Sequence, residues 1–178
     1  MYLTPHASVG ILISQHVDKP LWVFVFAFLS HFVLDFIPHG DEPIGEWMHS
    51  RLRRVVFIAT IDLTLVFFMT MTVLAIETDP TTTSLYLAGI FGAILPDFLS
   101  MVFPKMHEKL NWFFVVRWVH SILHTSRITH MVSGVNWLHM KLHKFLLNRY
   151  QVKISLERGI IFQSIFLVFV LLLISYSI

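Results

Sequence analysis

The chain contains no cysteine, which excludes disulfide bonds, thiolate zinc sites and cysteine nucleophiles. It is also poor in charge, because Asp, Glu, Lys and Arg make up only 13% of its 178 residues, against about 25% in soluble domains. The apolar fraction of 56% argues equally against intrinsic disorder. A formal net charge of +2 gives no indication of nucleic-acid binding. The length suits a single domain.

The sequence contains long apolar runs with few charged residues. A helix needs about 20 mostly apolar residues to cross a bilayer, and four segments meet this requirement. The predicted spans cover residues 21–37, 55–76, 85–103 and 159–178. A shorter apolar stretch, 7–14, is predicted to be a half-helix with Thr4 as its N-cap and Pro5 as its first helical residue. We therefore expect an all-α fold, a polytopic membrane helical bundle that forms one integral membrane domain over residues 1–178.

Basic residues are concentrated in two of the segments between the predicted spans. Residues 38–54 and 104–158 together hold twelve of the 13 Lys and Arg residues, whereas 77–84 hold none. Because cytoplasmic loops carry an excess of Lys and Arg, both basic segments are predicted to be cytoplasmic. Within 104–158, apolar residues at helical spacing are interleaved with basic ones. That pattern predicts amphipathic helices that lie on the cytoplasmic membrane surface.

Several ionisable side chains lie inside or just beyond the predicted spans, where such groups are costly and mark functional sites by default. His31, Asp35 and His39 are spaced four residues apart, so one helical face can present all three. Imidazole and carboxylate groups together suit zinc, manganese or iron(II). The sequence therefore predicts a divalent metal site, with zinc as the first choice. Its candidate ligands are His6, His31, Asp35, His39 and Asp62.

Each of these residues also has a structural interpretation. Asp62 taken alone is as consistent with a structural role as with a functional one. Asp97 follows Pro96 and could receive backbone N–H groups at a broken helix. His39-Gly40-Asp41 could form only a turn. The joint occurrence of two His and two Asp residues between positions 31 and 41, at a membrane exit, favours the metal site.

Further candidates lie at the same predicted membrane face. General bases, general acids or ligands of a second ion are expected among Asp41, Asp97, His124 and His130. Guanidinium groups that would hold a substrate phosphate are expected at Arg51, Arg54 and Arg127. With both basic segments inside, all these groups converge at the cytoplasmic interface.

A weak internal similarity relates residues 32–36 to residues 94–98. Both segments have an Asp near the end of an apolar span, at Asp35 and Asp97, with a proline close by. A duplication and the mere likeness of two helix ends explain this similarity equally well.

Three elements of the sequence resemble the membrane-bound metal-dependent hydrolase family: Thr4-Pro5-His6, the block 30–41 and Leu95-Pro96-Asp97. The His-x3-Asp pattern with a following Pro and His is also similar to the zinc-binding segment of bacterial phospholipase C and the S1/P1 nucleases. The chain departs from the family after Asp97, where no second Asp follows. The resemblance covers most of residues 1–130 and implies a hydrolase of the bacterial inner membrane.

Three functions stay open at this point. The first is a metal-dependent hydrolase with its site facing the cytoplasm, acting on a phosphoester such as a lipid-linked substrate, with membrane lipid as its partner. The second is a metal-ion or proton transporter, with a path through His31, Asp35, Asp62 and Asp97. The third is a non-catalytic membrane scaffold. Because the ionisable groups gather at one face, the hydrolase is the first hypothesis.

Overall fold

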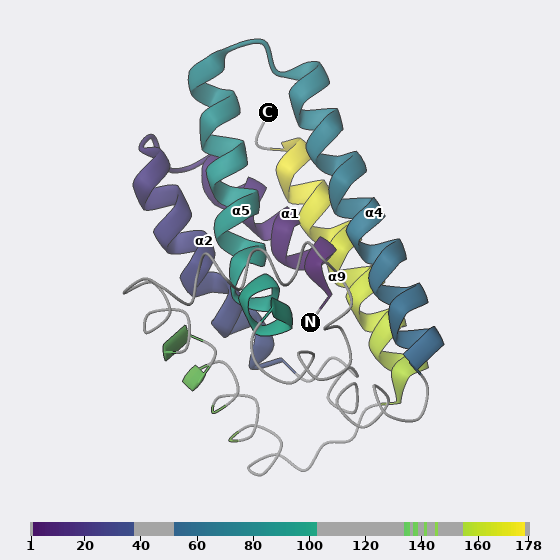
Figure 1. The fold of residues 1–178 in the computed structure, drawn as a ribbon. Coiled ribbons are helices and arrows are strands. Elements are labelled where there is room, and N and C mark those ends of the chain that lie inside the picture. The colour runs from purple at the N-terminus through teal and green to yellow at the C-terminus, as the bar shows by residue number, and fades with distance from the viewer. Residues whose placement is uncertain are drawn as a thin grey trace, which may run out of the picture.

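The computed structural model describes residues 2–37, 52–102 and 155–176, together with isolated helical positions between 134 and 145. This part of the chain contains helices and no strand, which confirms the predicted all-α fold for the described residues (Figure 1). Its helices are α1 (Leu3–Ser14), α2 (Pro20–Asp35), α4 (Leu52–Ile76), α5 (Pro80–Val102) and α9 (Leu156–Tyr176). The short helix α1 lies in the middle of the bundle and contacts each of the other four.

Three of these helices are long and apolar enough to cross a membrane. They contain the segments Val56–Ile76, Pro80–Leu99 and Glu157–Tyr176. Large apolar side chains point outward along them, among them Phe57, Phe67 and Leu172. Exposed apolar surface of this extent is unfavourable in water and favourable against lipid. The chain is therefore a membrane protein with transmembrane helices.

Helix α2 is shorter than the predicted span over residues 21–37. Its 16 residues extend over about 24 Å, less than the roughly 30 Å of a hydrocarbon core. The helix starts with Pro20 in its first turn. It ends at Asp35, before Ile37, and a residue that precedes a proline is disfavoured in the helical conformation. The structure thus has three helices of spanning length, and a fourth span remains a prediction.

The predicted start of the N-terminal half-helix is wrong by two residues. The N-cap is Tyr2 and not Thr4, so Thr4 and Pro5 occupy the second and third helical positions. No side chain of the segment itself caps the helix. The Thr-Pro pattern predicts the wrong start because the first N–H groups of α1 donate to side chains of α4 and α9, as described below.

Glycine allows α1 to approach α5 closely. A Cβ atom added to Gly10 or to Gly89 would run into the backbone carbonyl of the other residue. Ala7 and Ile11 of α1 are buried beside this contact, against Ile90 of α5. Without a hydrophobic effect between helices in lipid, such close backbone packing is a main source of helix association. The contact fixes α1 along α5 and so places the start of α1 beside the last turns of α5.

The end of α2, the start of α4, the end of α5 and the start of α9 lie on one side of the bundle, and α1 begins partway along it, with its start directed to that side (Figure 1). The short link between α4 and α5 lies on the other side. The helix ends that flank the two strongly basic segments of the sequence therefore all lie on the side to which the start of α1 is directed. The predicted interfacial helices of 104–158 lie almost wholly outside the described residues.

The Gly10–Gly89 contact can be tested with Gly89→Val. We expect this variant to lose thermal stability, because the new side chain would separate α1 from α5, even though valine is the better helix former. The measurement is the unfolding temperature in detergent, with Ala75→Val on the exposed face of α4 as the matched control. Equal unfolding temperatures for the two variants would contradict the close approach.

Candidate metal centre

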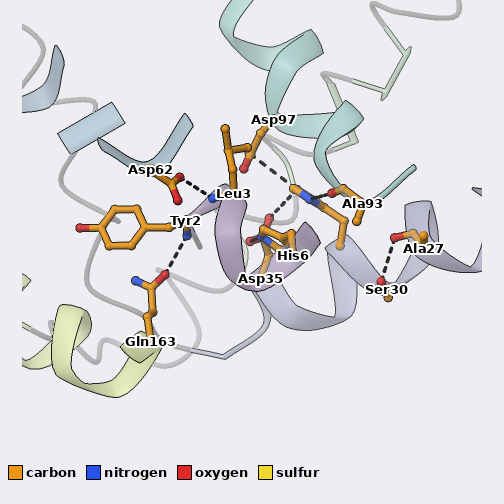
Figure 2. Close-up of polar contacts among 11 residues, drawn as sticks. Tyr2, Leu3, His6, Ala27, Ser30, Asp35, Asp62, Ala93, Asp97 and Gln163 are labelled. Atoms are coloured by element: carbon orange, nitrogen blue, oxygen red, sulfur yellow. Dashed lines mark hydrogen bonds and ion pairs between the residues drawn. The ribbon is translucent and has the colours of Figure 1, made fainter. Parts of the chain in front are cut away.

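Three helices bring four ionisable side chains together at the end where α1 begins (Figure 2). His6 comes from the first turn of α1, His31 and Asp35 from the last turns of α2, and Asp97 from α5. His31 and Asp35 share one face of α2, as their four-residue spacing predicts. We call these four residues the His–Asp cluster. His6, His31 and Asp97 each have one possible ligand atom within 4.8 Å of those of the other two, so these three residues could hold a metal ion.

The distances in the His–Asp cluster match those between ligands of one small cation. His6 Nε2 lies 3.3 Å from Asp35 Oδ1, and His31 Nε2 lies 3.2 Å from Asp35 Oδ2. His31 Nε2 also lies 3.6 Å from Asp97 Oδ1. Tetrahedral zinc with bonds near 2.0–2.1 Å separates its ligand atoms by about 3.3–3.4 Å. Each of these three contacts is thus close to the separation of two ligands on one zinc-type ion, whereas the ligand atoms of His6, His31 and Asp97 lie up to 4.8 Å apart.

The backbone of α5 decides which nitrogen of His31 faces the carboxylates. His31 Nδ1 lies 2.8 Å from the carbonyl oxygen of Ala93, in the turn that contains the buried Pro96. A carbonyl oxygen only accepts hydrogen bonds, so Nδ1 carries the proton. In the neutral ring Nε2 then presents its lone pair toward Asp35 and Asp97. Metal-ligating histidines are commonly oriented in this way by a carbonyl on the other ring nitrogen.

These contacts are unfavourable unless a proton or a cation lies inside the cluster. A lone pair that faces two carboxylates inside an apolar bundle is repelled by both. A divalent ion between the ligand atoms, or a proton on His31 Nε2 or on one of the carboxylates, would remove the repulsion. His6 favours the ion, because neither of its buried nitrogens makes a hydrogen bond to a described residue, although Nε2 lies close to Asp35. The residues present therefore fit a divalent metal.

The His–Asp cluster is closed on one side and open on the other. The side chains of His6 and His31 are fully buried and that of Asp35 is 3% exposed, whereas the side chain of Asp97 is 20% exposed. The two imidazole rings stack on each other, with their centroids 4.0 Å apart. Asp97 is thus the member of the cluster that a substrate or water can reach. It lies five residues before the end of α5, or about 8 Å along the helix axis.

The structure places Asp62 outside the His–Asp cluster. Both of its carboxylate oxygens accept hydrogen bonds from the start of α1: Oδ2 from Leu3 N at 2.6 Å, and Oδ1 from Thr4 N at 3.0 Å and Thr4 Oγ1 at 2.6 Å. This predicted ligand therefore serves as an acceptor for a helix start, the structural alternative that the sequence left open.

Several predicted site residues cannot be placed. His39, Asp41, Arg51, His124, Arg127 and His130 lie outside the described residues. Arg54 belongs to α4, but its side chain is not described. A second ion and a phosphate-binding group of arginines therefore stay predictions.

Gln163 is a buried polar residue that the sequence reasoning missed. It lies in α9 with 3% of its surface exposed, and its Oε1 accepts a hydrogen bond from Tyr2 N at 2.7 Å. A single amide within the apolar run 159–178 was the available signal. Gln163 carries no charge, so a search restricted to ionisable side chains does not include it.

Comparison of the chain with protein-family models, with curated proteins and with solved structures finds no match. The interpretation of the His–Asp cluster therefore depends on its own geometry and on the sequence resemblance described above.

Metal content is the first property to measure. We expect detergent-purified protein supplied with zinc to hold it tightly, and His31→Ala and Asp35→Ala to lose it, because each removes a donor from the buried cluster. Elemental mass spectrometry provides the measurement. Ser30→Ala is the matched control, because the Ser30 hydroxyl donates only within α2, to Ala27 O. Protein that takes up no metal, with variants equally stable, would contradict the metal site and leave a proton within the cluster as the explanation of its contacts.

Proposed function

We propose that the protein is a membrane-embedded metal-dependent hydrolase whose metal is held by the His–Asp cluster. The observation that carries the proposal is the orientation of His31, whose Nδ1 is engaged by the Ala93 carbonyl while Nε2 faces two carboxylates. A histidine ligand that is oriented by a hydrogen bond on its other nitrogen, beside one solvent-accessible carboxylate, is typical of catalytic rather than structural metal sites. The sequence resemblance to the membrane-bound metal-dependent hydrolases supports the same class.

The members of the His–Asp cluster would divide the chemistry according to their exposure. His6, His31 and Asp35 are buried and would hold the ion. Such an ion would act as a Lewis acid toward the oxygen of a scissile phosphoester. Asp97, at the accessible side, would accept a proton from the attacking water as a general base and keep that water oriented.

The depth and the orientation of the site favour a substrate of the membrane. Asp97 lies two residues inside the end of the candidate span Pro80–Leu99, and therefore close to the boundary between hydrocarbon and headgroups. The helix ends that flank the two basic segments of the sequence lie on this same side. By the positive-inside rule this end would face the cytoplasm, and basic residues there would attract anionic lipid. A phosphoester attached to a lipid fits this location best.

The transporter hypothesis finds less support in the described helices. A path across the membrane needs polar side chains at both ends and between them. Within residues 2–37, 52–102 and 155–176, the buried ionisable side chains His6, His31, Asp35 and Asp62 all lie in or beside the first turn of α1 or in the last turns of α2. The hydroxyl groups of Ser8 and Ser14 donate to carbonyls within α1 itself. The hydrolase therefore remains the first proposal.

Activity can be tested with short-chain phosphatidic acid in mixed micelles and with p-nitrophenyl phosphate in solution. We expect zinc-loaded protein to release phosphate from the lipid faster than from the soluble ester. Asp97→Asn should lower kcat by about 10²–10⁴ because it removes the general base, while it retains bound zinc. Asp35→Ala should lose both zinc and activity, and Ser30→Ala neither. Zinc-loaded protein that hydrolyses neither compound would count against phosphoesters as the substrate class.

A further inference from the structure

Two buried polar side chains lie outside the His–Asp cluster, on helices that otherwise present apolar residues. They are Asp62 of α4 and Gln163 of α9. Both helices are of membrane-spanning length, and a polar group buried at such a position is costly unless its hydrogen bonds are satisfied. Each side chain therefore needs a hydrogen-bond partner, and both have their partners in the same segment of the chain.

That segment is the first turn of α1. A helix leaves the N–H groups of its N-cap and of its first three residues without acceptors inside the helix. In α1 these positions are Tyr2, Leu3, Thr4 and Pro5. Gln163 accepts from Tyr2, Asp62 accepts from Leu3 and Thr4, and Pro5 has no N–H to satisfy. The two side chains thus account for the whole helix start (Figure 2).

A carboxylate is also the suitable charge for this end. The N-terminus of a helix carries partial positive charge, which a nearby anion stabilises. Helix α1 has no acidic residue in its own first turn and no side-chain cap of its own. Helix α4 therefore provides both the acceptor and the charge that α1 lacks.

His6 lies one turn beyond these contacts. Its ring stacks on His31 and its Nε2 lies 3.3 Å from Asp35, but Nδ1 has no hydrogen-bond partner among the described residues. His31, in contrast, is oriented by the Ala93 carbonyl. The position of the His6 donor atom therefore depends on the backbone of α1, whose start is fixed by Asp62 and Gln163.

We infer that Asp62 and Gln163 are positioning residues that hold α1 so that His6 reaches the metal of the His–Asp cluster. This inference rests on the proposed metal centre and assigns it two residues that do not touch the ion. It also separates two roles for Asp62. A ligand must offer a carboxylate oxygen to the metal, whereas a positioning residue acts only on the N–H groups and the partial charge at the start of α1.

The test compares variants that keep the acceptor with variants that remove it. Asp62→Asn and Gln163→Glu keep an oxygen that can accept from α1, whereas Asp62→Ala and Gln163→Leu do not. Thr70→Ala is the matched control on α4, because among the described residues the Thr70 hydroxyl bonds only to Val66 O of its own helix. The measurements are the zinc dissociation constant, by competition with a chelator, and the visible spectrum of the Co²⁺-substituted protein, which reports ligand geometry.

We expect Asp62→Ala and Gln163→Leu to weaken zinc binding by about 10–100-fold, the usual effect of removing a group that orients a ligand, and to alter the Co²⁺ spectrum. Asp62→Asn, which keeps one of the two acceptor oxygens and loses the charge, should fall between Asp62→Ala and the parent in both measurements. Thr70→Ala should match the parent. If Asp62→Ala does not fold, Gln163→Leu with Gln163→Glu as its rescue provides the same comparison.

Three results would overturn the inference, and they are distinguishable. Unchanged affinity and spectrum in Asp62→Ala and Gln163→Leu would show that α1 needs neither residue for metal binding. Loss of zinc in Asp62→Asn as complete as in His31→Ala would make Asp62 a ligand. A parent protein that binds neither zinc nor Co²⁺ would remove the proposed metal centre itself, and this inference with it.

Discussion

The structure depends on how two carboxylates are accommodated beside one imidazole inside an apolar bundle. Asp35 and Asp97 both lie against Nε2 of His31, while the Ala93 carbonyl engages Nδ1. In such surroundings the carboxylates and the lone pair of a neutral ring would repel each other. A cation makes the same arrangement favourable and draws α1, α2 and α5 to one point. The need to relieve this repulsion is therefore also a constraint on the packing of three helices.

The long helices and the short helix α1 have different roles in the bundle. Helices α4 and α9 present apolar side chains outward along most of their length. Their buried polar residues, Asp62 and Gln163, both serve the start of α1. Helix α1 is too short to span a membrane, and it is held by polar contacts at its start and by the Gly10–Gly89 contact further along. A short helix in lipid needs such contacts, because its end N–H groups cannot turn to water.

The internal similarity of the sequence has a counterpart at the site. Asp35 and Asp97, the acidic residues of the two similar segments, both contact His31 Nε2. Each lies near the end of a helix that runs toward the same side of the bundle. Similar helix ends are sufficient to explain the likeness, since both segments must bring a carboxylate to one depth. A duplication would have produced the same arrangement, so the geometry is compatible with either origin.

The sequence by itself determined the features that depend on neighbouring residues along one helix. Apolar length decided that the chain is helical and belongs in a membrane, and the four-residue spacing placed His31 and Asp35 on one face. Only the tertiary structure decided that His6 and Asp97 join them and that Asp62 does not. The periodicity of a helix relates residues within it, but distances between helices are set by contacts such as Gly10 with Gly89, which no local pattern encodes. For the same reason the start of α1 was misplaced, because its acceptors belong to α4 and α9.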